Sequence, residues 1–432
     1  MQAATSIIPT GGAKRRSGEI SNSRDFSTSL EMTGAIVIST GAAARPRNGE
    51  ISFARNDNRY GKVWNMRALH RIEQVQRLLE DQVLDAIIVR ANSDLFWLTG
   101  FEDVFDSEQA HVAIITRQDC ILHTDTRYVT AMREKAHEEG IWQIDASRER
   151  EVEFIAHMLK ELKLVTGRVA IDETMPLSLY RKYSDAMPNA RFKERSDDIL
   201  KLRAVKDADE IVLMKRAQAI ASEAFMETLE DLQPGMSERD ASIMLEFNMK
   251  RLGASELAFA NIVASGPNGA KPHAIPSERQ FEQGDFIVFD FGARVGGYCS
   301  DTTRTVCIGG ASEKQIRVYE AVRRANEWVA ANIKPGVTGA QMHTLAESEL
   351  AKADFEHKMG HSLGHGVGID IHELPLLSPT NKEALVAGNV VTDEPGIYLP
   401  GEMGVRIEDC GVVTETGFES FCDITHELMV IE

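Results

Sequence analysis

The chain has 432 residues, of which 43% are hydrophobic and 26% are charged, and its formal net charge is -18 at pH 7. This length predicts two or three domains with sizeable cores. The acidic balance disfavours nucleic acid and anionic membranes as partners, because both are themselves negatively charged. No apolar run reaches the roughly 18 to 20 residues that cross a bilayer, so we expect a soluble protein without a membrane partner.

The cysteines favour a reducing compartment. They are odd in number and show no CxxC spacing of the kind found in metal sites; they stand at positions 120, 299, 307, 410 and 422. We therefore predict a cytoplasmic protein without a disulfide framework. The apolar stretch at 34–44, behind the basic AKRR at 13–16, is too short and too far from the first residue for a signal peptide.

Residues 1–65 are rich in Ser, Thr, Gly, Ala and Arg and show no sustained hydrophobic period. This composition predicts a flexible extension outside the folded domains. An oligomerisation arm and a true start at Met66 are the alternative interpretations. The first amphipathic helix is expected to open at that methionine. Its apolar positions recur at helical spacing, at Met66, Leu69, Ile72, Val75 and Leu79.

Residues 66–199 alternate short apolar runs with helical stretches, which predicts an α/β amino-terminal domain. The runs are LDAIIVRA, DLFWLTGF, HVAIITR, DCILHTD and RVAIDE. A highly charged stretch from Arg195 leads into a long helix through Leu232, so we place the domain boundary between residues 199 and 200. A Pro-Gly pair ends that helix, and SERD at 237–240 predicts a capping box for the next one.

Residues 200–432 mix helices with hairpins, which predicts an α+β domain. Two helical segments, at 312–333 and 339–354, separate the two hairpins that carry most of the acidic candidates for a metal site. The hairpins therefore come together only through the fold.

The first hairpin carries two aspartates. An ARVGG break separates two apolar, β-branched runs, and a turn centred between Val295 and Gly296 places Asp290 directly opposite Asp301. Opposed side chains have Cβ atoms roughly 5 Å apart, which suits a pair of metals about 3.5 to 4 Å apart. Like charges in this position are unfavourable without a cation, so a solvated surface pair is the weaker interpretation.

The second hairpin repeats the arrangement with glutamates. With its turn centred near Gly401, Glu394 faces Glu408. Pro395 has no N–H to donate to a neighbouring strand, so we expect the strand to be interrupted there. The two hairpins together supply four carboxylates.

Three histidines, His361, His365 and His372, lie in the glycine-rich segment KMGHSLGHGVGIDIHELP. Alternate glycines from 364 to 368 disfavour a helix and favour a strand or loop in which backbone closely approaches backbone or ligand. We expect these histidines to point into one cleft. His365 alone would more often be a core or loop histidine, but beside four carboxylates it completes a ligand set. The predicted metal ligands are Asp290, Asp301, His365, Glu394 and Glu408.

This set is mostly hard oxygen, which favours two divalent ions, with Mn2+ ahead of Co2+, Fe2+ or Zn2+. Two such ions can activate water and polarise a carbonyl, as peptide hydrolysis at neutral pH requires. The proton for the leaving nitrogen can come by way of Glu394 or from a nearby histidine, since imidazole titrates near pH 7. The sequence leaves that choice open.

Four separated motifs resemble, in order and spacing, the creatinase, prolidase and aminopeptidase P family of pita-bread-fold metallopeptidases. The motifs are PNGAKPH, DFGARVGGYCSDTTRT, HSLGHGVGIDIHELP and TDEPGIYLPGEMGVRIED. The resemblance covers residues 66–432 and implies that 200–432 form a pita-bread catalytic domain. It also implies that Asp301 and Glu408 bridge two ions. Asp290 then binds one ion, and His365 and Glu394 bind the other.

The resemblance implies roles for further residues. Glu394 is expected to act as general base toward the bridging water. His273, His361 and His372 are expected to bind substrate and stabilise the tetrahedral intermediate, and Arg406 to lie near the carboxyl-terminal side of the substrate. The plainer interpretations are a rigid exposed loop for His273, a turn for His372 and a partner of neighbouring carboxylates for Arg406.

Asp393 departs from the family pattern, which usually has an apolar residue before the glutamate. Strand alternation points it away from Glu394, to the opposite face. There it either meets a cation or perturbs the site.

The resemblance implies an enzyme that removes an amino-terminal residue preceding proline, either an Xaa-Pro dipeptidase or an Xaa-Pro aminopeptidase acting on Xaa-Pro dipeptides or short peptides. We expect a homodimer in which the amino-terminal domain narrows the cleft. A methionine aminopeptidase shares the ligand set but usually lacks a folded domain like 66–195 and the GVRIED motif. A lyase built on the same fold is also compatible with the motifs, and a non-catalytic binding protein is the least favoured interpretation.

Overall fold

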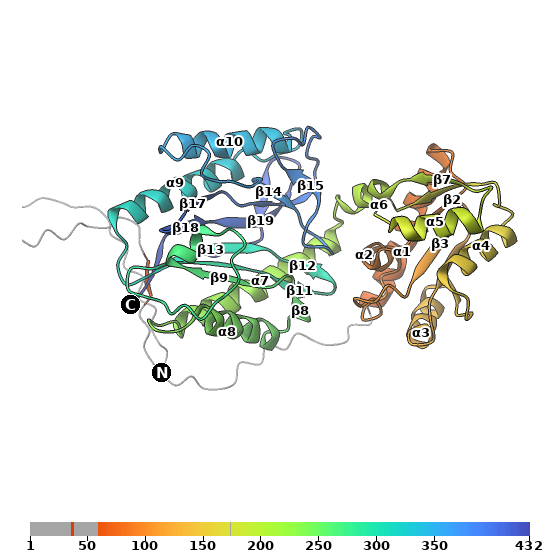
Figure 1. Ribbon diagram of the computed structural model, residues 1–432, viewed down its shortest axis with the longest axis horizontal. Coiled ribbons are helices and arrows are strands. Elements are labelled where there is room, and N and C mark those ends of the chain that lie inside the picture. Colours follow the sequence, from red (N-terminus) through yellow and green to blue (C-terminus); the bar gives the residue numbers. More distant parts are fainter. Residues whose placement is uncertain (1–35, 39–58, 173) are drawn as a thin grey trace, which may run out of the picture. The chain divides into compact units, whose positions relative to one another are not determined.

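The protein is represented by a computed structural model that describes residues 36–38, 59–172 and 174–432, and these fall into two compact units (Figure 1). The amino-terminal unit runs to Lys206 and also contains the segment Gly368–Leu374. The carboxy-terminal unit contains the rest of the described chain. The division nearest the predicted boundary falls after Lys206, whereas the sequence placed that boundary between 199 and 200.

The described part of the amino-terminal unit is built on a six-stranded sheet of order β5-β4-β3-β2-β6-β7. Its strands are β2 Ala86–Val89, β3 Val112–Thr116, β4 Cys120–His123, β5 Gln143–Asp145, β6 Arg168–Ile171 and β7 Arg191–Glu194. Its helices are α1 Arg59–Asp81, α2 Asn92–Thr99, α3 Val129–Glu139, α4 Glu151–Glu161, α5 Leu177–Ala186 and α6 Ser196–Arg203. Strands β2, β3 and β4 are buried along their whole length, as apolar runs covered on both faces should be. The predicted α/β class is confirmed.

Helix α1 shows the expected amphipathic face. Ile72, Val75 and Leu79 are at most 3% exposed, while Leu69 is 48% exposed. The helix begins at Arg59 and so includes the last residues of the predicted extension.

Residues Ile36–Ile38 form strand β1, which pairs in parallel with β21. Apart from these residues and the start of α1, the predicted extension, and with it most of the stretch at 34–44, lies outside the described residues.

The carboxy-terminal unit places a sheet between two pairs of helices: α9 and α10 lie on one side, and α7 and α8 on the other (Figure 1). The helices are α7 Ala208–Glu230, α8 Glu238–Arg251, α9 Glu313–Ala330 and α10 Gly339–Ala351, with a 3-10 turn η1 at Gly266–Ala270. The strands are β8 Glu256–Leu257, β9 Ile262–Ser265, β10 Phe286–Phe291, β11 Ala293–Val295, β12 Tyr298–Cys299, β13 Thr302–Ile308, β14 Gly364–Gly366, β15 Glu373–Leu377, β16 Val390–Asp393, β17 Gly396–Leu399, β18 Met403–Arg406, β19 Glu408–Val413, β20 Phe418–Ser420 and β21 Met429–Ile431. The first two residues of β15 belong to the amino-terminal unit. The predicted α+β architecture is confirmed.

The alternation of side chains in β13 explains how one sheet contributes to two hydrophobic cores, one on each of its faces. Val306 and Ile308 pack in the core formed with α7 and α8, whereas Cys307 between them packs in the core formed with α9. Successive residues of a strand point to opposite faces, so a continuous apolar run feeds both cores.

The starts of α7 and α8 carry different caps. At α7, Asp207 and Glu210 form a complete capping box. At α8, the predicted box is half formed: the Ser237 hydroxyl accepts from the Asp240 N–H at 3.0 Å, but Asp240 accepts from the Ser237 hydroxyl rather than from its backbone.

No helix among the described residues is long and apolar enough to span a membrane.

Candidate active site

The first hairpin has a different register from the predicted one. Asp290 pairs with Thr303, not with Asp301, because Gly296 and Gly297 both adopt positive φ, 53° and 80°, and form the two-residue turn between β11 and β12. A turn with both central residues at positive φ is of type I′ and is favoured by a Gly-Gly pair. The centre therefore lies one residue later than predicted, and Asp301 lies diagonally from Asp290.

The second hairpin has the predicted register. Strands β16 and β19 pair as far as Asp393 and Asp409, and β17 and β18 continue in the same register beyond the gap. Glu394 and Glu408 lie in that gap and face each other across it. The ladder is interrupted at Pro395, as predicted, because proline has no N–H to donate.

Strand pairing also brings the two hairpins together. Thr303 of β13 pairs with Asp290 of β10 on one side and with Glu408 of β19 on the other. Its hydroxyl donates to Glu408 Oε2 at 2.6 Å. Asp290 of β10 and Glu408 of β19 thus flank β13, with Asp301 just before β13 and Glu394 just after β16.

His365 reaches the carboxylates from β14. Its backbone N–H donates to Thr392 Oγ1 at 3.0 Å, and a Cβ at Gly364 would lie 2.2 Å from the Thr392 carbonyl oxygen, which explains why this strand needs glycine. The imidazole Nε2 lies 3.6 Å from Asp301 Oδ2 and 3.4 Å from Glu394 Oε1. The strand with closely approaching backbone that the glycines predicted is therefore present.

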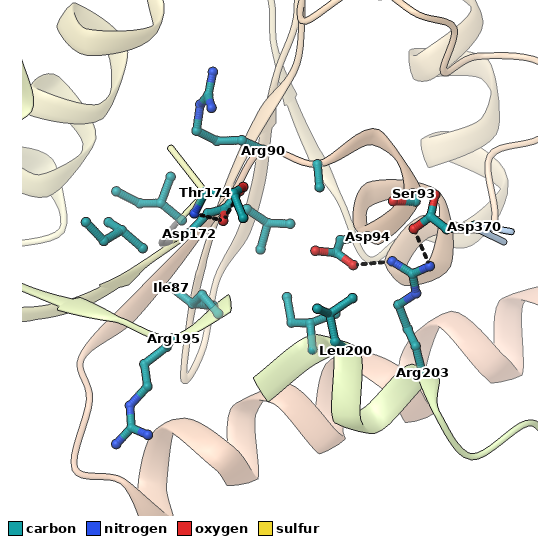
Figure 2. A pocket seen from close by; sticks show the side chains of 15 residues that line it. Ile87, Arg90, Ser93, Asp94, Asp172, Thr174, Arg195, Leu200, Arg203 and Asp370 are labelled. Carbon is teal, nitrogen blue, oxygen red and sulfur yellow. Dashed lines mark hydrogen bonds and ion pairs between the residues drawn. The ribbon is translucent and has the colours of Figure 1, made fainter. Parts of the chain in front are cut away.

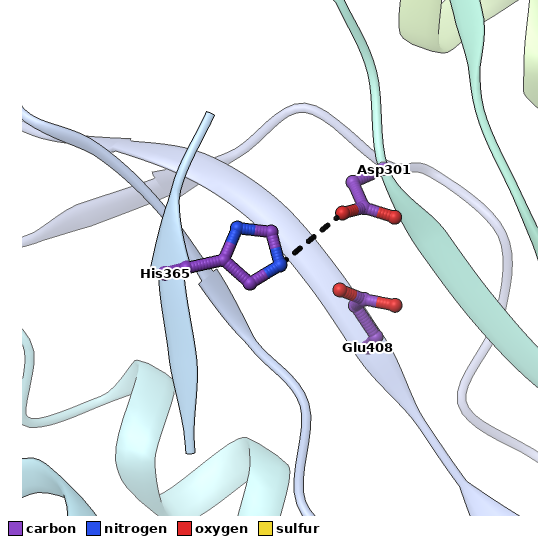
Figure 3. Close-up of side chains that lie close together, drawn as sticks. All are labelled: Asp301, His365 and Glu408. Atoms are coloured by element: carbon purple, nitrogen blue, oxygen red, sulfur yellow. Dashed lines mark ion pairs between the residues drawn. The ribbon is translucent and has the colours of Figure 1, made fainter. Parts of the chain in front are cut away.

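Three of the predicted ligands point toward one another in Figure 3: Asp301, His365 and Glu408 each offer an atom within 4.8 Å of the others. A proton on His365 Nδ1 fits its 3.0 Å contact with the Gly366 carbonyl oxygen. The Nε2 lone pair then faces two carboxylates, a repulsive arrangement that a metal cation between them would relieve.

The electrostatics of the cluster also favour a bound cation. Burial and then the charge of Glu408 raise the pKa of Asp301 well above its usual range, and burial and Glu394 do the same to Glu408. Burial raises the pKa of Glu394 to about 7. Oδ1 of Asp290 is buried and has no hydrogen-bond partner among the described residues. The donor set therefore fits divalent cations, which would neutralise the carboxylates.

Arg406 is the buried cation of the site, with 3% of its surface exposed. It donates to Asp290 Oδ2 at 2.6 Å, to Thr303 Oγ1 at 3.1 Å and to Tyr398 Oη at 2.7 Å. A fourth bond, of 3.3 Å, reaches the Pro272 carbonyl oxygen. The interpretation of Arg406 as a partner of neighbouring carboxylates is thus observed.

Tyr398 links Arg406 to His361 and was missed by the sequence analysis. Its hydroxyl lies 2.9 Å from His361 Nε2. Burial lowers the pKa of His361 to about 4 and raises that of Tyr398 to about 12, so both are neutral at pH 7. In the predicted hairpin register Tyr398 is the diagonal neighbour of Arg406 on the same face, and that spacing could have identified it.

The other two histidines lie in different units. His273 is in the loop after η1, and an electrostatic interaction with it lowers the pKa of both Glu394 and His361, which puts it within electrostatic reach of the cluster. His372 lies in the segment Gly368–Leu374 of the amino-terminal unit. Its role remains a prediction.

Asp393 points away from the metal ligands, as strand alternation predicted. It is 0% exposed, and a backbone hydrogen bond from Ala330 is the influence that lowers its pKa. Burial and the charge of Asp409 raise its pKa well above the usual range. The Asp409 carboxylate is itself paired with Arg304 at 2.8 Å.

The amino-terminal unit contains a separate charged pocket at the carboxyl ends of β2 and β6 (Figure 2). Arg203 lines it and donates to Asp94 at 2.6 Å, to Asp370 at 2.7 Å and to Glu373 at 2.6 Å. Lys206 adds a 2.7 Å contact with Glu373. These bonds hold the segment that carries His372 within this unit.

Comparisons with known proteins agree with this architecture. The model of metallopeptidase family M24 matches residues 212–415, and that of the creatinase/prolidase N-terminal domain matches 71–205. An uncharacterized peptidase of Bacillus subtilis is 33% identical over 84% of this chain and 100% of its own length. An Xaa-Pro dipeptidase from Bacillus anthracis has a TM-score of 0.78 at 34% identity and covers 84% of this chain and 99% of its own. An X-Pro aminopeptidase from Thermotoga maritima has a TM-score of 0.76 at 33% identity and covers 83% and 99%.

The predicted resemblance and pita-bread fold are therefore confirmed. The chain belongs to metallopeptidase family M24, and it is a peptidase that uses divalent metal.

Proposed function

We propose that the protein hydrolyses the peptide bond between an amino-terminal residue and proline, as an Xaa-Pro dipeptidase or Xaa-Pro aminopeptidase. The observation that carries this proposal is the meeting of four carboxylates and the His365 imidazole on neighbouring strands, in a chain whose relatives include enzymes named for that activity. The creatinase/prolidase N-terminal domain disfavours a methionine aminopeptidase.

The proposed metal site holds two divalent ions, with manganese favoured by the hard-oxygen donors. Asp301 and Glu408, the most deeply buried of the ligands at 4% and 2% exposed, would bridge the ions. Asp290 would bind one ion, and His365 and Glu394 the other. When bound, the ions supply Lewis acidity for the scissile carbonyl and a nucleophile at neutral pH.

Glu394 is the proposed general base. It lies at the interruption of the ladder beside Pro395, where its side chain is 17% exposed, so a water molecule can reach it. Thr392 Oγ1 donates to Glu394 Oε1 at 3.1 Å and fixes the carboxylate. A carboxylate that is both oriented and reachable meets the geometric requirement for general base catalysis.

The neutral His361 and Tyr398 would form one wall of the substrate site. The Tyr398 hydroxyl can donate to His361 Nε2 while it accepts from Arg406, so both rings have fixed orientations. The exposed His273 would bind substrate opposite Glu394, and His372 would act on the tetrahedral intermediate. Arg406, whose guanidinium is engaged by protein groups, would act by orienting Asp290 and the tyrosine.

Two further parts of the proposal concern assembly and location. We expect a homodimer in which the amino-terminal unit limits the length of substrates. The described cysteines are all free thiols, and four of them are buried, which supports a reducing compartment such as the cytoplasm.

Release of alanine by the metal-stripped protein, with manganese added back, tests the proposal. Ala-Pro and Ala-Pro-Ala are the substrates, and Ala-Ala is the control. Metal-dependent cleavage of the dipeptide alone indicates a dipeptidase, and cleavage of the tripeptide indicates an aminopeptidase. Cleavage of neither by a protein with bound metal would refute the proposed substrate class.

A further inference from the structure

Glu238, the first residue of α8, is a fully buried carboxylate without an assigned role, at 0% exposure. Its oxygens accept hydrogen bonds from the last residue of β9 and from the loop that follows that strand. Oε1 accepts from the Ser265 N–H at 2.7 Å and the Ser265 hydroxyl at 2.8 Å. Oε2 accepts from the Ser277 N–H at 3.0 Å and the Ser277 hydroxyl at 2.6 Å. Asn268 Nδ2 lies 3.1 and 3.2 Å from the two oxygens.

These donors keep the carboxylate ionised. Burial alone would raise the pKa of Glu238, but the hydrogen bonds from Ser277 and Ser265 outweigh burial, and the pKa lies below its usual value. Hydrogen bonds to an ionised acceptor are stronger than those between neutral groups. The position of Glu238 in the first turn of a helix stabilises the negative charge further.

The bonds to Ser265 and Ser277 close both ends of one loop, residues 265–277, on a single side chain. The backbone strengthens this closure, because the Glu238 N–H donates to the Arg279 carbonyl at 3.0 Å and the Arg239 N–H to the Ser277 carbonyl at 3.0 Å. The loop is therefore fixed to the start of α8 by main-chain and side-chain bonds together.

The middle of the same loop lies against the metal site. Turn η1 packs on β18 so closely that a Cβ at Gly404 would come within 1.8 Å of the Gly269 carbonyl oxygen. Arg406 donates to the Pro272 carbonyl at 3.3 Å, and His273 is the next residue. Glu238 thus holds the two ends of the loop, and strand β18, which carries Arg406, contacts its middle.

We propose that Glu238 is a positioning residue for His273: by closing the 265–277 loop on one carboxylate, it fixes where the imidazole stands relative to Glu394 and His361. The inference deepens the proposed function and rests on it. A purely structural role, in which Glu238 only anchors the start of α8, would lower the melting temperature without changing turnover by the folded enzyme.

The Glu238→Gln variant separates these roles with little change in volume. Its amide has one acceptor oxygen and one NH2, so the NH2 must face the donors of either Ser265 or Ser277, and one end of the loop is released. Glu246→Gln is the matched control, because it makes the same chemical change on the same helix, at a residue whose side chain is 42% exposed and contacts Lys250.

The first experiment is a double-mutant cycle on the manganese-loaded, full-length protein with Ala-Pro. We expect Glu238→Gln to lower kcat/KM by about tenfold to a hundredfold, the range caused by small displacements of a binding group, and Glu246→Gln to leave it unchanged. In a His273→Ala background Glu238→Gln should cause no further loss, because it acts through the imidazole. An equal loss in both backgrounds, or no loss in the wild-type background, would overturn the inference.

Amide hydrogen exchange of the same proteins supplies a readout that does not depend on activity. Glu238→Gln should speed exchange in peptides from 265–277 and leave α7 unchanged, whereas unaltered protection of the loop would overturn the inference. If wild type and Glu246→Gln bind metal but do not cleave Ala-Pro, the proposed function fails and the catalytic part of this inference fails with it. The exchange data then decide whether Glu238 holds the loop.

Discussion

Replacing Arg203 by methionine should destabilise the amino-terminal unit strongly. The guanidinium is 2% exposed and donates to three carboxylates at 2.6 to 2.7 Å, two of which appear in Figure 2. Removing one partner of a buried ion pair costs about 3 to 5 kcal/mol. Lys206 still neutralises Glu373 in the variant, but Asp94 loses the charge that opposes the effect of burial on its pKa. We therefore expect the free energy of unfolding of this unit to fall by about 3 kcal/mol, the lower end of that range.

Urea unfolding of the full-length protein, followed by hydrogen exchange in peptides from α2 and β6, measures this unit separately. With a urea dependence of about 2 kcal/mol per molar, the expected loss lowers the unfolding midpoint by about 1.5 M. Asp370→Asn is the matched control: its side chain is 46% exposed, so the change should cost less than about 1 kcal/mol. A midpoint for Arg203→Met no lower than that of Asp370→Asn would refute the reasoning.

Three other predictions concern the carboxy-terminal unit. Burial would raise the pKa of Asp409, but a buried arginine and a histidine lower it to about 2. The ionised Asp409 therefore adds about 2 kcal/mol to the free energy of unfolding above about pH 4, and this contribution is lost as the pH falls toward 2. In chemical denaturation, acidification should lower the free energy of unfolding less for Asp409→Asn than for wild type. Gly364→Ala places a Cβ 2.2 Å from the Thr392 oxygen and should abolish metal binding, measured by elemental analysis, whereas Gly417→Ala, with no neighbour within 4 Å, should not. Tyr398→Phe removes one hydrogen-bonded hydroxyl and should lower kcat/KM for Ala-Pro about tenfold, or about 1.4 kcal/mol; unchanged kinetics would contradict its place in the site.

The contrast between the two hairpins shows what local sequence can determine. In the second, a single Gly401 and the Pro395 break leave one reasonable centre, and the predicted register is correct. In the first, the adjacent Gly296 and Gly297 permit two centres that differ by one residue, and the conformational preference of a type I′ turn selects the later one. The one-residue error in the predicted register makes Asp301 the partner of Asp290 instead of Thr303. The predicted ligands nevertheless lie on neighbouring strands.

Contacts between distant segments could not be predicted in this way. Arg203 and Glu373 are 170 positions apart, and neither residue carries a periodic signal that points to the other. Glu238 is similar, because SERD predicts a cap through Ser237 and Asp240 and gives no indication that the intervening glutamate turns inward to hold a loop. Such buried charges are specified by the tertiary fold and become visible only with it.

The number of metal ions bound per chain tests the central claim most directly. Elemental analysis after equilibration with manganese should give two ions for wild type, and a lower content for Asp301→Asn and Glu408→Gln, which alter the two proposed bridging carboxylates. Asp393→Asn, which changes the buried carboxyl on the opposite face, should still bind two. A wild type without bound metal, or an Asp301→Asn variant with the full wild-type content, would contradict the assignment of these residues as a dinuclear site.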